Sequence, residues 1–544
     1  MKNLTILFFL SFLAACTIQY PIMQQTDAST KGMVSAAQPL ATLAGQQMLE
    51  KGGNAVDAAV ASAFALSVVE PSMSGLGGRL QAIVRLPNGE IHGVDATTEA
   101  PIKYDTATTP IVKFGYEVIG IPGVVAGLCK LLEEHGTLSL ETVMQPAIKY
   151  AQKGFPILKG EAARHRMAKE QLTKFAGSRQ YFMKDGRTYE EGEKLVQKDL
   201  ANTLRLIAKG GRDAFYKGAI AEKIVADFQE NKGILTLEDL ANYGARSSRI
   251  LSGSYRGHDL HGLWVPSFGA LTIQILQILE NLPVSELKDA DWASAVSQAI
   301  NIAYQDRYQQ MLPNTDSIVQ VLTSKAYAKQ QAMKINLNGA SLGHLETEVF
   351  INEPVGWSSE MGHTTHLSTA DKDGMMVALT QSLGPNMGSK VASPELGFLY
   401  AVTLGRYLGV YLPGQRAASF ISPFIITKNG EPFMALGAAG GNKIVSAVTA
   451  VSSRVIDHQL PLDQALMAPR VYRNGAEMLV ETHKGTGWKQ TFTKELQKEG
   501  FEVKVIDQPA RFGRVHAVLF DEKTGRWIGG ADPDWEGAVA GEKQ

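Results

Sequence analysis

The sequence has few cysteines, no excess of charge of either sign and no long hydrophobic run beyond its first residues. Two cysteines among 544 residues cannot form a disulfide framework or a thiolate metal site. Lys and Arg number 53 against 54 Asp and Glu, which argues against nucleic acid as a partner, because phosphate binding requires a positive excess. No Walker loop, dinucleotide fingerprint or HExxH motif occurs, which disfavours nucleotide and zinc chemistry. The ordinary balance of hydrophobic (44%) and charged (20%) residues indicates a large globular protein, and we expect an enzyme.

The N-terminus resembles a bacterial secretion signal. Residues 4–15 form an apolar run of about 12 residues, too short to cross a bilayer but typical of a signal-peptide core. The run ends in Leu-Ala-Ala-Cys, which resembles the lipobox, where lipid is attached to the cysteine. We therefore predict a signal peptide over residues 1–15, lipidation at Cys16 and a tether over 16–31. This places the protein in the periplasm, anchored to the outer membrane; the alternative is an ordinary signal peptide without lipid.

Hydrophobic periodicity separates a helical part of the chain from a sheet-rich part. Helical spacing predominates between about residues 118 and 335, and Asn54 stands where it can cap an Ala-rich helix that runs to about Val69. Residues 336–363 lose this periodicity and are interpreted as a linker or loop. Short apolar runs that flank two-residue turn signals predict hairpins over residues 81–95, 365–382, 424–436 and 515–530. Helices layered on antiparallel sheets predict an α+β sandwich.

One short stretch has residues suited to nucleophilic catalysis, at the seam between the linker and the first of the later strands. Here His363 precedes Thr364. A threonine hydroxyl is a poor nucleophile without an adjacent base, but a cut before Thr364 would free an α-amine with a pKa near ~7.7–8.0 that can act as that base. Downstream, Gly440 and Gly441 precede an apolar helix, whose backbone N–H groups and positive dipole end are the ingredients of an oxyanion hole. Each piece alone is equally typical of an ordinary strand or helix start.

Several motifs occur together in an order that identifies a family. The sequences GGNAVDAA at residues 52–59, GIPGVVAG at 120–127 and TTHLS at 364–368 resemble signatures of the gamma-glutamyltranspeptidases, a family of N-terminal-nucleophile hydrolases. Further matches in the same order are YRG at 255–257, YQDR at 304–307 and APR at 468–470. The resemblance covers nearly everything after the tether. We identify the chain as a divergent member of that family.

The resemblance implies a precursor that cuts itself between His363 and Thr364, within one four-layer αββα sandwich. The products would be a large segment over residues 32–363 and a small segment over residues 364–544. Thr364 would then take an acyl group from a substrate amide and pass it to water or to the amine of an amino acid or peptide. The resemblance calls for no metal or organic cofactor. It also implies a supporting hydroxyl and an oxyanion pair, at Ser382 and at Gly440 and Gly441.

The sequence departs from the family pattern where a substrate carboxylate is held. Thr97 stands where the family has an arginine that binds the α-carboxylate of a γ-glutamyl group. Of two adjacent serines near that carboxylate, Ser419 remains and Phe420 replaces the other. Arg79, which follows the glycine loop, is a candidate for supplying the missing contact, since a guanidinium suits bidentate recognition of a carboxylate. The alternative for Arg79 is a surface or purely structural arginine.

A second departure concerns the side of the pocket that holds the substrate α-amino group. A gap-free count from the nucleophile places Gly384, Thr403 and Arg406 at the three positions of the family that bind the amine. Arg406 replaces an acidic residue, so an ammonium bound there would lose an attraction and gain a repulsion. The chain between Arg406 and Arg416 is also shorter than in relatives that carry a lid, which would leave the pocket open to bulkier substrates.

Three functions remain open at this point. The leading hypothesis is a glutathione hydrolase-like γ-glutamyltransferase acting on small γ-glutamyl amides, the commonest outcome in the family. The altered pocket favours a second reading, in which the same nucleophile acts on another acyl group, such as a des-amino dicarboxylic acyl or a cell-envelope peptide. The third is a catalytically silent lipoprotein scaffold, which the intact nucleophile and oxyanion residues disfavour.

Overall fold

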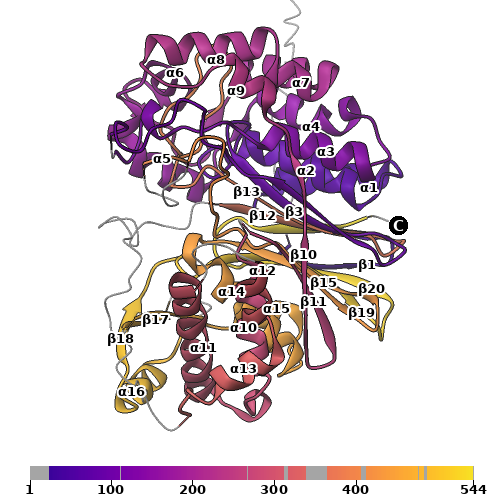
Figure 1. The fold of residues 1–544 in the computed structure, drawn as a ribbon. Coiled ribbons are helices and arrows are strands. Elements are labelled where there is room, and N and C mark those ends of the chain that lie inside the picture. The colour runs from indigo at the N-terminus through magenta and orange to yellow at the C-terminus, as the bar shows by residue number, and fades with distance from the viewer. Residues whose placement is uncertain are drawn as a thin grey trace, which may run out of the picture.

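Two stacked antiparallel sheets with helices on both outer faces make up the molecule (Figure 1). Each sheet has seven strands. The predicted four-layer αββα sandwich is therefore confirmed. The computed structural model describes residues 24–110, 112–265, 267–310, 316–337, 364–405, 412–475, 477–482 and 487–542.

The first sheet runs in the order β21-β2-β12-β13-β3-β4-β9. Its strands are β2 (Gly32–Ala36), β3 (Arg79–Arg85), β4 (Ile91–Ala96), β9 (Arg246–Ser248), β12 (Thr365–Asp371), β13 (Met376–Ser382) and β21 (Ala538–Gly541). Its outer face is covered by α1 (Pro39–Glu50), α2 (Ala55–Val69), α3 (Val124–His135) and α4 (Leu140–Lys153).

The second sheet runs in the order β1-β20-β19-β15-β14-β11-β10. Its strands are β1 (Thr26–Ser29), β10 (Ile250–Tyr255), β11 (His258–Leu263), β14 (Phe424–Lys428), β15 (Glu431–Ala439), β19 (Arg514–Asp521) and β20 (Arg526–Ala531). Its outer helices include α10 (Gly269–Leu279), α11 (Asp289–Gln310), α14 (Ile444–Ile456) and α15 (Leu462–Met467).

Smaller elements surround the two layers of helices. The further helices are α5 (Lys159–Leu172), α6 (Ala176–Phe182), α7 (Lys198–Tyr216), α8 (Ala219–Glu230), α9 (Leu237–Asn242), α12 (Asp316–Leu322), α13 (Lys325–Ala332) and α16 (Gln490–Lys498). The short strands are β5 (Phe155–Pro156) with β8 (Lys194–Leu195), β6 (Met183–Lys184) with β7 (Arg187–Thr188), and β16 (Val471–Asn474), β17 (Glu477–Glu481) and β18 (Glu502–Ile506).

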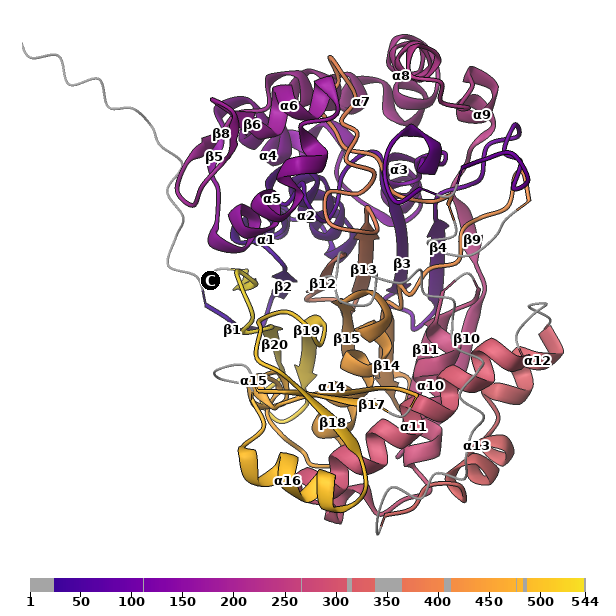
Figure 2. The ribbon, with the colours of Figure 1, turned by 90° about the vertical axis from the view of Figure 1, so that its left-hand side faces the viewer.

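Strands from both sides of Thr364 alternate in the sheets, so neither side forms a separate domain. Figure 2 shows β12 and β13 lying between the indigo strands β2 and β3. The four predicted hairpins are confirmed as β3–β4, β12–β13, β14–β15 and β19–β20. The prediction of a tether over residues 16–31 is wrong at its C-terminal end, where Thr26–Ser29 forms β1 and pairs with β20. A four-residue polar strand at a sheet edge has too little hydrophobic pattern to be predicted.

The motif at residues 52–59 caps the start of α2 and binds a neighbouring loop, which explains its Asn and Asp residues. The Asn54 side chain accepts hydrogen bonds from the first-turn N–H groups of α2, as predicted, and the Asp57 carboxylate accepts from the Asn54 N–H at 2.8 Å. The same buried carboxylate also accepts from the N–H groups of Thr137 and Leu138, each at 3.0 Å, and from the Thr137 hydroxyl at 2.6 Å. Asp57 thus ties the start of α2 to the loop before α4.

We expect Asp57→Ala to lower the free energy of unfolding by about 2–4 kcal/mol, because several buried donors lose a charged acceptor at once. The measurement is urea unfolding in a Thr364→Ala background, so that one uncut polypeptide unfolds. Glu50→Ala, at the exposed end of α1, is the matched control and should cost little. Equal effects of the two substitutions would contradict this role for Asp57.

Candidate active site

Four of the predicted site residues lie in one row across the first sheet. Ser382 of β13 pairs with Arg79 of β3, and the β12–β13 register, continued by one position before Thr365, places Thr364 opposite Ser382. Thr97 lies one position beyond the last β3–β4 pair, next to Arg79. Residues directly opposite one another on antiparallel strands point to the same face, with Cα atoms about 4.5–5.5 Å apart. The row therefore brings together residues from four strands at one end of the sheet.

The row faces the second sheet. Every second residue along a strand points to the same face. The residues that share the face of the row belong to the apolar cluster between the two sheets; they include Ala370 on β12, Ala378 on β13 and Ile83 on β3. Thr364 is buried, with 4% of its surface exposed, and its Oγ1 lies 3.1 Å from the Oγ of Ser382. The Ser382 hydroxyl also accepts a hydrogen bond from the Gly384 N–H at 2.9 Å. This second contact holds the serine oxygen beside the threonine.

The glycine pair lies at the same end of the sandwich, on the opposing sheet. Strand β15 ends at Ala439, whose partner on β19 is Arg514, and Arg514 donates to the Thr364 carbonyl at 3.4 Å. Gly440 follows at once, and Gly441 has a φ of +59°, a conformation suited to glycine. A short turn then leads into α14, as predicted. The pair is thus placed at the end of the sandwich that contains the nucleophile.

Arg79 contacts the chain segment that contains Thr403. Arg79 is 2% exposed, so the alternative of a surface arginine is wrong, and its guanidinium donates to the Val402 carbonyl. Thr403 is the next residue; its N–H donates to the Val118 carbonyl at 2.7 Å, and its buried hydroxyl has no hydrogen-bond partner among the described residues. A buried cation and an unsatisfied buried hydroxyl therefore lie in segments that contact each other at the Val402 carbonyl.

The other predicted residues make local contacts or lie outside the described residues. The buried Thr97 hydroxyl donates to the Asp95 carboxylate at 2.7 Å, and Arg416 forms an ion pair with Asp95 at 3.1 Å. The Ser419 hydroxyl accepts from the N–H of Ile421 at 3.2 Å. The predictions for Cys16, His363 and Arg406 fall on residues outside the described part of the chain.

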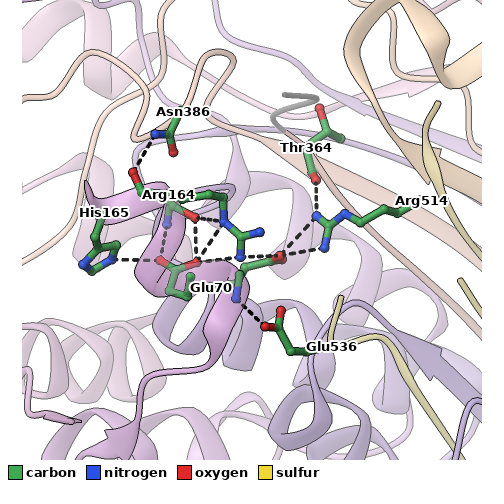
Figure 3. A network of polar contacts seen from close by, with 10 residues as sticks. Glu70, Arg164, His165, Thr364, Asn386, Arg514 and Glu536 are labelled. Atoms are coloured by element: carbon green, nitrogen blue, oxygen red, sulfur yellow. Dashed lines mark hydrogen bonds and ion pairs between the residues drawn. The ribbon is translucent and has the colours of Figure 1, made fainter. Parts of the chain in front are cut away.

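Sequence reasoning missed a buried network of charges beside the nucleophile (Figure 3). Glu70, which follows α2, forms ion pairs with Arg514 at 3.2 Å and with Arg164 of α5 at 3.4 Å. Arg164 also pairs with Glu161 at 2.8 Å. Burial raises the pKa of Glu70, against the opposing charges of Arg514 and Arg164. At Glu161 the opposing charge of Arg164 and hydrogen bonds overcome burial and lower the pKa to about 2. The one available signal was that Glu70 follows an apolar helix and Arg514 begins a largely apolar strand.

Comparisons of the whole chain with known proteins identify its family. A profile of the gamma-glutamyltranspeptidase family matches residues 41–542. The chain belongs to the gamma-glutamyltranspeptidase family. It is 33% identical to the glutathione hydrolase proenzyme of Escherichia coli (strain K12), over 92% of this chain and 90% of that protein. It is 31% identical to the Acylase ACY 1 proenzyme of Pseudomonas sp. (strain SE83), over 91% and 90%. The crystal structure of cephalosporin acylase from Bacillus halodurans superposes with a TM-score of 0.85 at 27% identity, covering 98% of this chain and 99% of that one.

Family membership confirms the resemblance found in the motifs, and it makes the chain an N-terminal-nucleophile hydrolase or transferase. Relatives named for different activities match at similar identity, so the comparisons leave the acyl group open. In the described part of the chain, no group of three or more His, Cys, Asp or Glu side chains is placed to hold a metal ion.

A neutral histidine stabilises the strand that carries Thr364. His366 lies two residues further along β12, and its ring nitrogens contact the hydroxyls of Thr380 at 2.7 Å and Ser368 at 3.0 Å. Burial lowers its pKa to about 3. His516 on β19 is also fully buried, and burial lowers its pKa well below the usual value. Both rings are therefore uncharged in the folded protein near neutral pH.

We expect the free energy of unfolding to fall as the pH drops below about 6.5, because the unfolded chain then binds protons at His366 that the folded chain excludes. This stability is fully present above the unfolded pKa and is lost towards the folded value of about 3, at up to about 1.4 kcal/mol per pH unit for this group. The test is urea unfolding between pH 7 and 5. His366→Gln keeps a hydrogen-bonding side chain and should flatten the slope; an unchanged slope would contradict the assignment.

Proposed function

We propose that the chain is a self-processing γ-glutamyl hydrolase and transferase in which Thr364 is the nucleophile. The observation that carries the proposal is the contact between Thr364 and Ser382 at the end of the first sheet, 3.1 Å between the two hydroxyl oxygens. A buried hydroxyl beside a second hydroxyl, opposite a glycine turn, has the composition required for acyl transfer through a threonine ester.

The first reaction is the cut before Thr364. The Thr364 Oγ attacks the carbonyl carbon of His363, the peptide bond to the Thr364 nitrogen breaks, and that nitrogen takes up a proton. The resulting ester on Oγ is hydrolysed by water, which leaves a carboxylate on His363 and an α-amine and hydroxyl on Thr364. Ser382 supports the attacking oxygen by hydrogen bonding.

The second reaction uses the new α-amine as the base. The amine accepts the hydroxyl proton while Oγ attacks the carbonyl carbon of the substrate amide. N–H groups of Gly440 and Gly441 stabilise the negative oxygen that develops. The amide bond breaks, the leaving nitrogen takes the proton, and the acyl group remains on Oγ as an ester. Water or an acceptor amine then attacks this ester, which releases the acid or the transferred amide.

A second candidate substrate is an acyl group that ends in a carboxylate but has no α-amino group. Arg79, whose backbone is opposite Ser382 and whose buried guanidinium donates to the Val402 carbonyl, and the unsatisfied Thr403 hydroxyl support a substrate carboxylate. The Thr97 hydroxyl donates its hydrogen to Asp95 and is therefore not available to donate to a substrate carboxylate. The sequence also has Arg406 where the family pattern has an acidic residue for the amine. This combination favours donors without an ammonium group.

We also propose that the protein is exported and lipid-anchored at Cys16 to the outer membrane. The apolar run and the lipobox-like Leu-Ala-Ala-Cys support this. No helix in the described part of the chain is long and apolar enough to cross a membrane.

We expect Thr364→Ala to abolish both the cut and the turnover of acyl amides, because no oxygen remains to attack. Thr364→Ser is the matched control and should still cut, with reduced turnover. The fragments are resolved by denaturing electrophoresis and intact mass, and turnover is followed as anilide hydrolysis. A Thr364→Ala chain that still splits at this site would contradict the proposed nucleophile.

We expect Arg79→Met to lower kcat/KM about 30-fold or more for γ-glutamyl and glutaryl anilides, because a charge-assisted contact to the carboxylate is lost. The butyryl anilide, which has no carboxylate, should be hydrolysed about equally by both proteins. Arg85→Met, at the far end of the same strand, is the control. A ratio of glutaryl to butyryl turnover unaffected by Arg79→Met would exclude Arg79 from carboxylate recognition.

A further inference from the structure

The charge network next to Thr364 joins the two segments that the cut would separate. Figure 3 shows Arg514 between Glu70 and the carbonyl of Thr364, with Arg164 on the far side of Glu70. Glu70 and Arg164 precede the cut, whereas Thr364 and Arg514 follow it. Glu536, from the end of the small segment, reinforces the link by accepting from the Gly160 N–H at 2.5 Å.

The charges of Glu70, Glu161, Arg164 and Arg514 are buried and paired. The side chains of Arg164, Glu70 and Arg514 are each no more than 2% exposed. The indole of Trp535 covers both guanidinium groups, 4.5 Å from Arg164 and 5.4 Å from Arg514. Charges at such depth are tolerated only when paired, and removal of one partner leaves the other uncompensated. A change of charge here therefore acts strongly on its neighbours.

We propose that Arg514 is a positioning residue for Thr364: it holds the nucleophile's carbonyl and, balanced by Glu70, favours the uncharged α-amine that accepts the proton in acyl transfer. The proposal rests on the function proposed above. The amine is separated from its own carbonyl oxygen by only three bonds, so a cation bound to that oxygen is a close neighbour of the amine. A nearby like charge disfavours protonation, and a nearby opposite charge favours it.

The charged and titratable groups around Thr364 come from several elements. The acidic groups are Glu70, after α2, and Glu161 of α5, and the basic groups are Arg514 of β19, Arg164 of α5 and Arg79 of β3. The histidines His366 and His516 are held uncharged by burial. Lys443, beyond the glycine pair, stands over the ring of Tyr472. Arg514 contacts the nucleophile residue itself, whereas Glu70 lies one contact further, so the positive charge dominates at Thr364.

The experiment measures the pH dependence of kcat/KM for a γ-glutamyl or glutaryl anilide with the full-length protein after self-cleavage. The acid limb of this profile reports the group that must be unprotonated in the free enzyme. Arg514→Met should move the limb to higher pH by about one unit, because the cation that contacts the Thr364 carbonyl is lost while the Glu70 carboxylate, still paired with Arg164, remains. Glu70→Gln should move it to lower pH, and the double variant should lie between the two. Arg514→Lys, which keeps the charge, should restore the limb toward that of the wild type.

Two controls make the outcome specific. Arg526→Met removes an exposed arginine on the neighbouring strand β20 and should leave the profile unchanged. If Arg514→Met fails to fold or to cut, the proposal still requires that Glu70→Gln move the acid limb of the profile to lower pH. The proposal would be overturned if the acid limb stayed in place in Glu70→Gln. It would also be overturned if the limb of Arg514→Lys moved as far as that of Arg514→Met. An uncut, inactive wild type would instead overturn the proposed function and this inference with it.

Discussion

The antiparallel register of β12, β13 and β3 is the constraint on which the site depends. A shift of one residue between two of these strands would turn every side chain of one strand to the other face. Thr364 would then lose Ser382, and Ser382 would lose Arg79. Because these strands are buried on both faces, with helices on one side and the second sheet on the other, such a shift would also expose or misplace the core.

The same register explains why the two segments can remain together after a cut. The strands that follow Thr364 lie between strands that precede it, so the sheet hydrogen bonds span the cleavage point. The buried ion pair between Glu70 and Arg514 adds a link beside Thr364. The cut breaks a single peptide bond, whereas the packing and hydrogen bonds that hold the two segments together extend over both sheets. A cut therefore changes the chemistry at Thr364 without requiring the fold to reorganise.

The sequence predicted the architecture well and the electrostatics poorly. Local patterns predicted the four hairpins and the helix cap at Asn54, and the family motifs predicted the sandwich. The assignment of Thr364 as the nucleophile stays a prediction. The charge network was not predictable, because Glu70 and Arg514 are 444 residues apart and neither has a local motif. Arg79 was left open between a site role and a surface or structural one for the same reason: its burial depends on strands contributed by distant parts of the chain. Its burial excludes the surface position, and its contact with the Val402 carbonyl is compatible with a structural role. The proposed roles of the other site residues also stay predictions: Ser382, Gly440, Gly441, Arg79, Thr403, Ser419, Thr97 and Arg406.

The central claim is that Thr364 becomes an N-terminal nucleophile through self-cleavage. The most direct measurement is intact mass with N-terminal sequencing of the purified full-length protein, incubated without added protease. Our account predicts two fragments in equal amounts, the smaller beginning at Thr364 and ending at Gln544. A single chain that stays uncut on long incubation, or a fragment that begins at another residue, would contradict it.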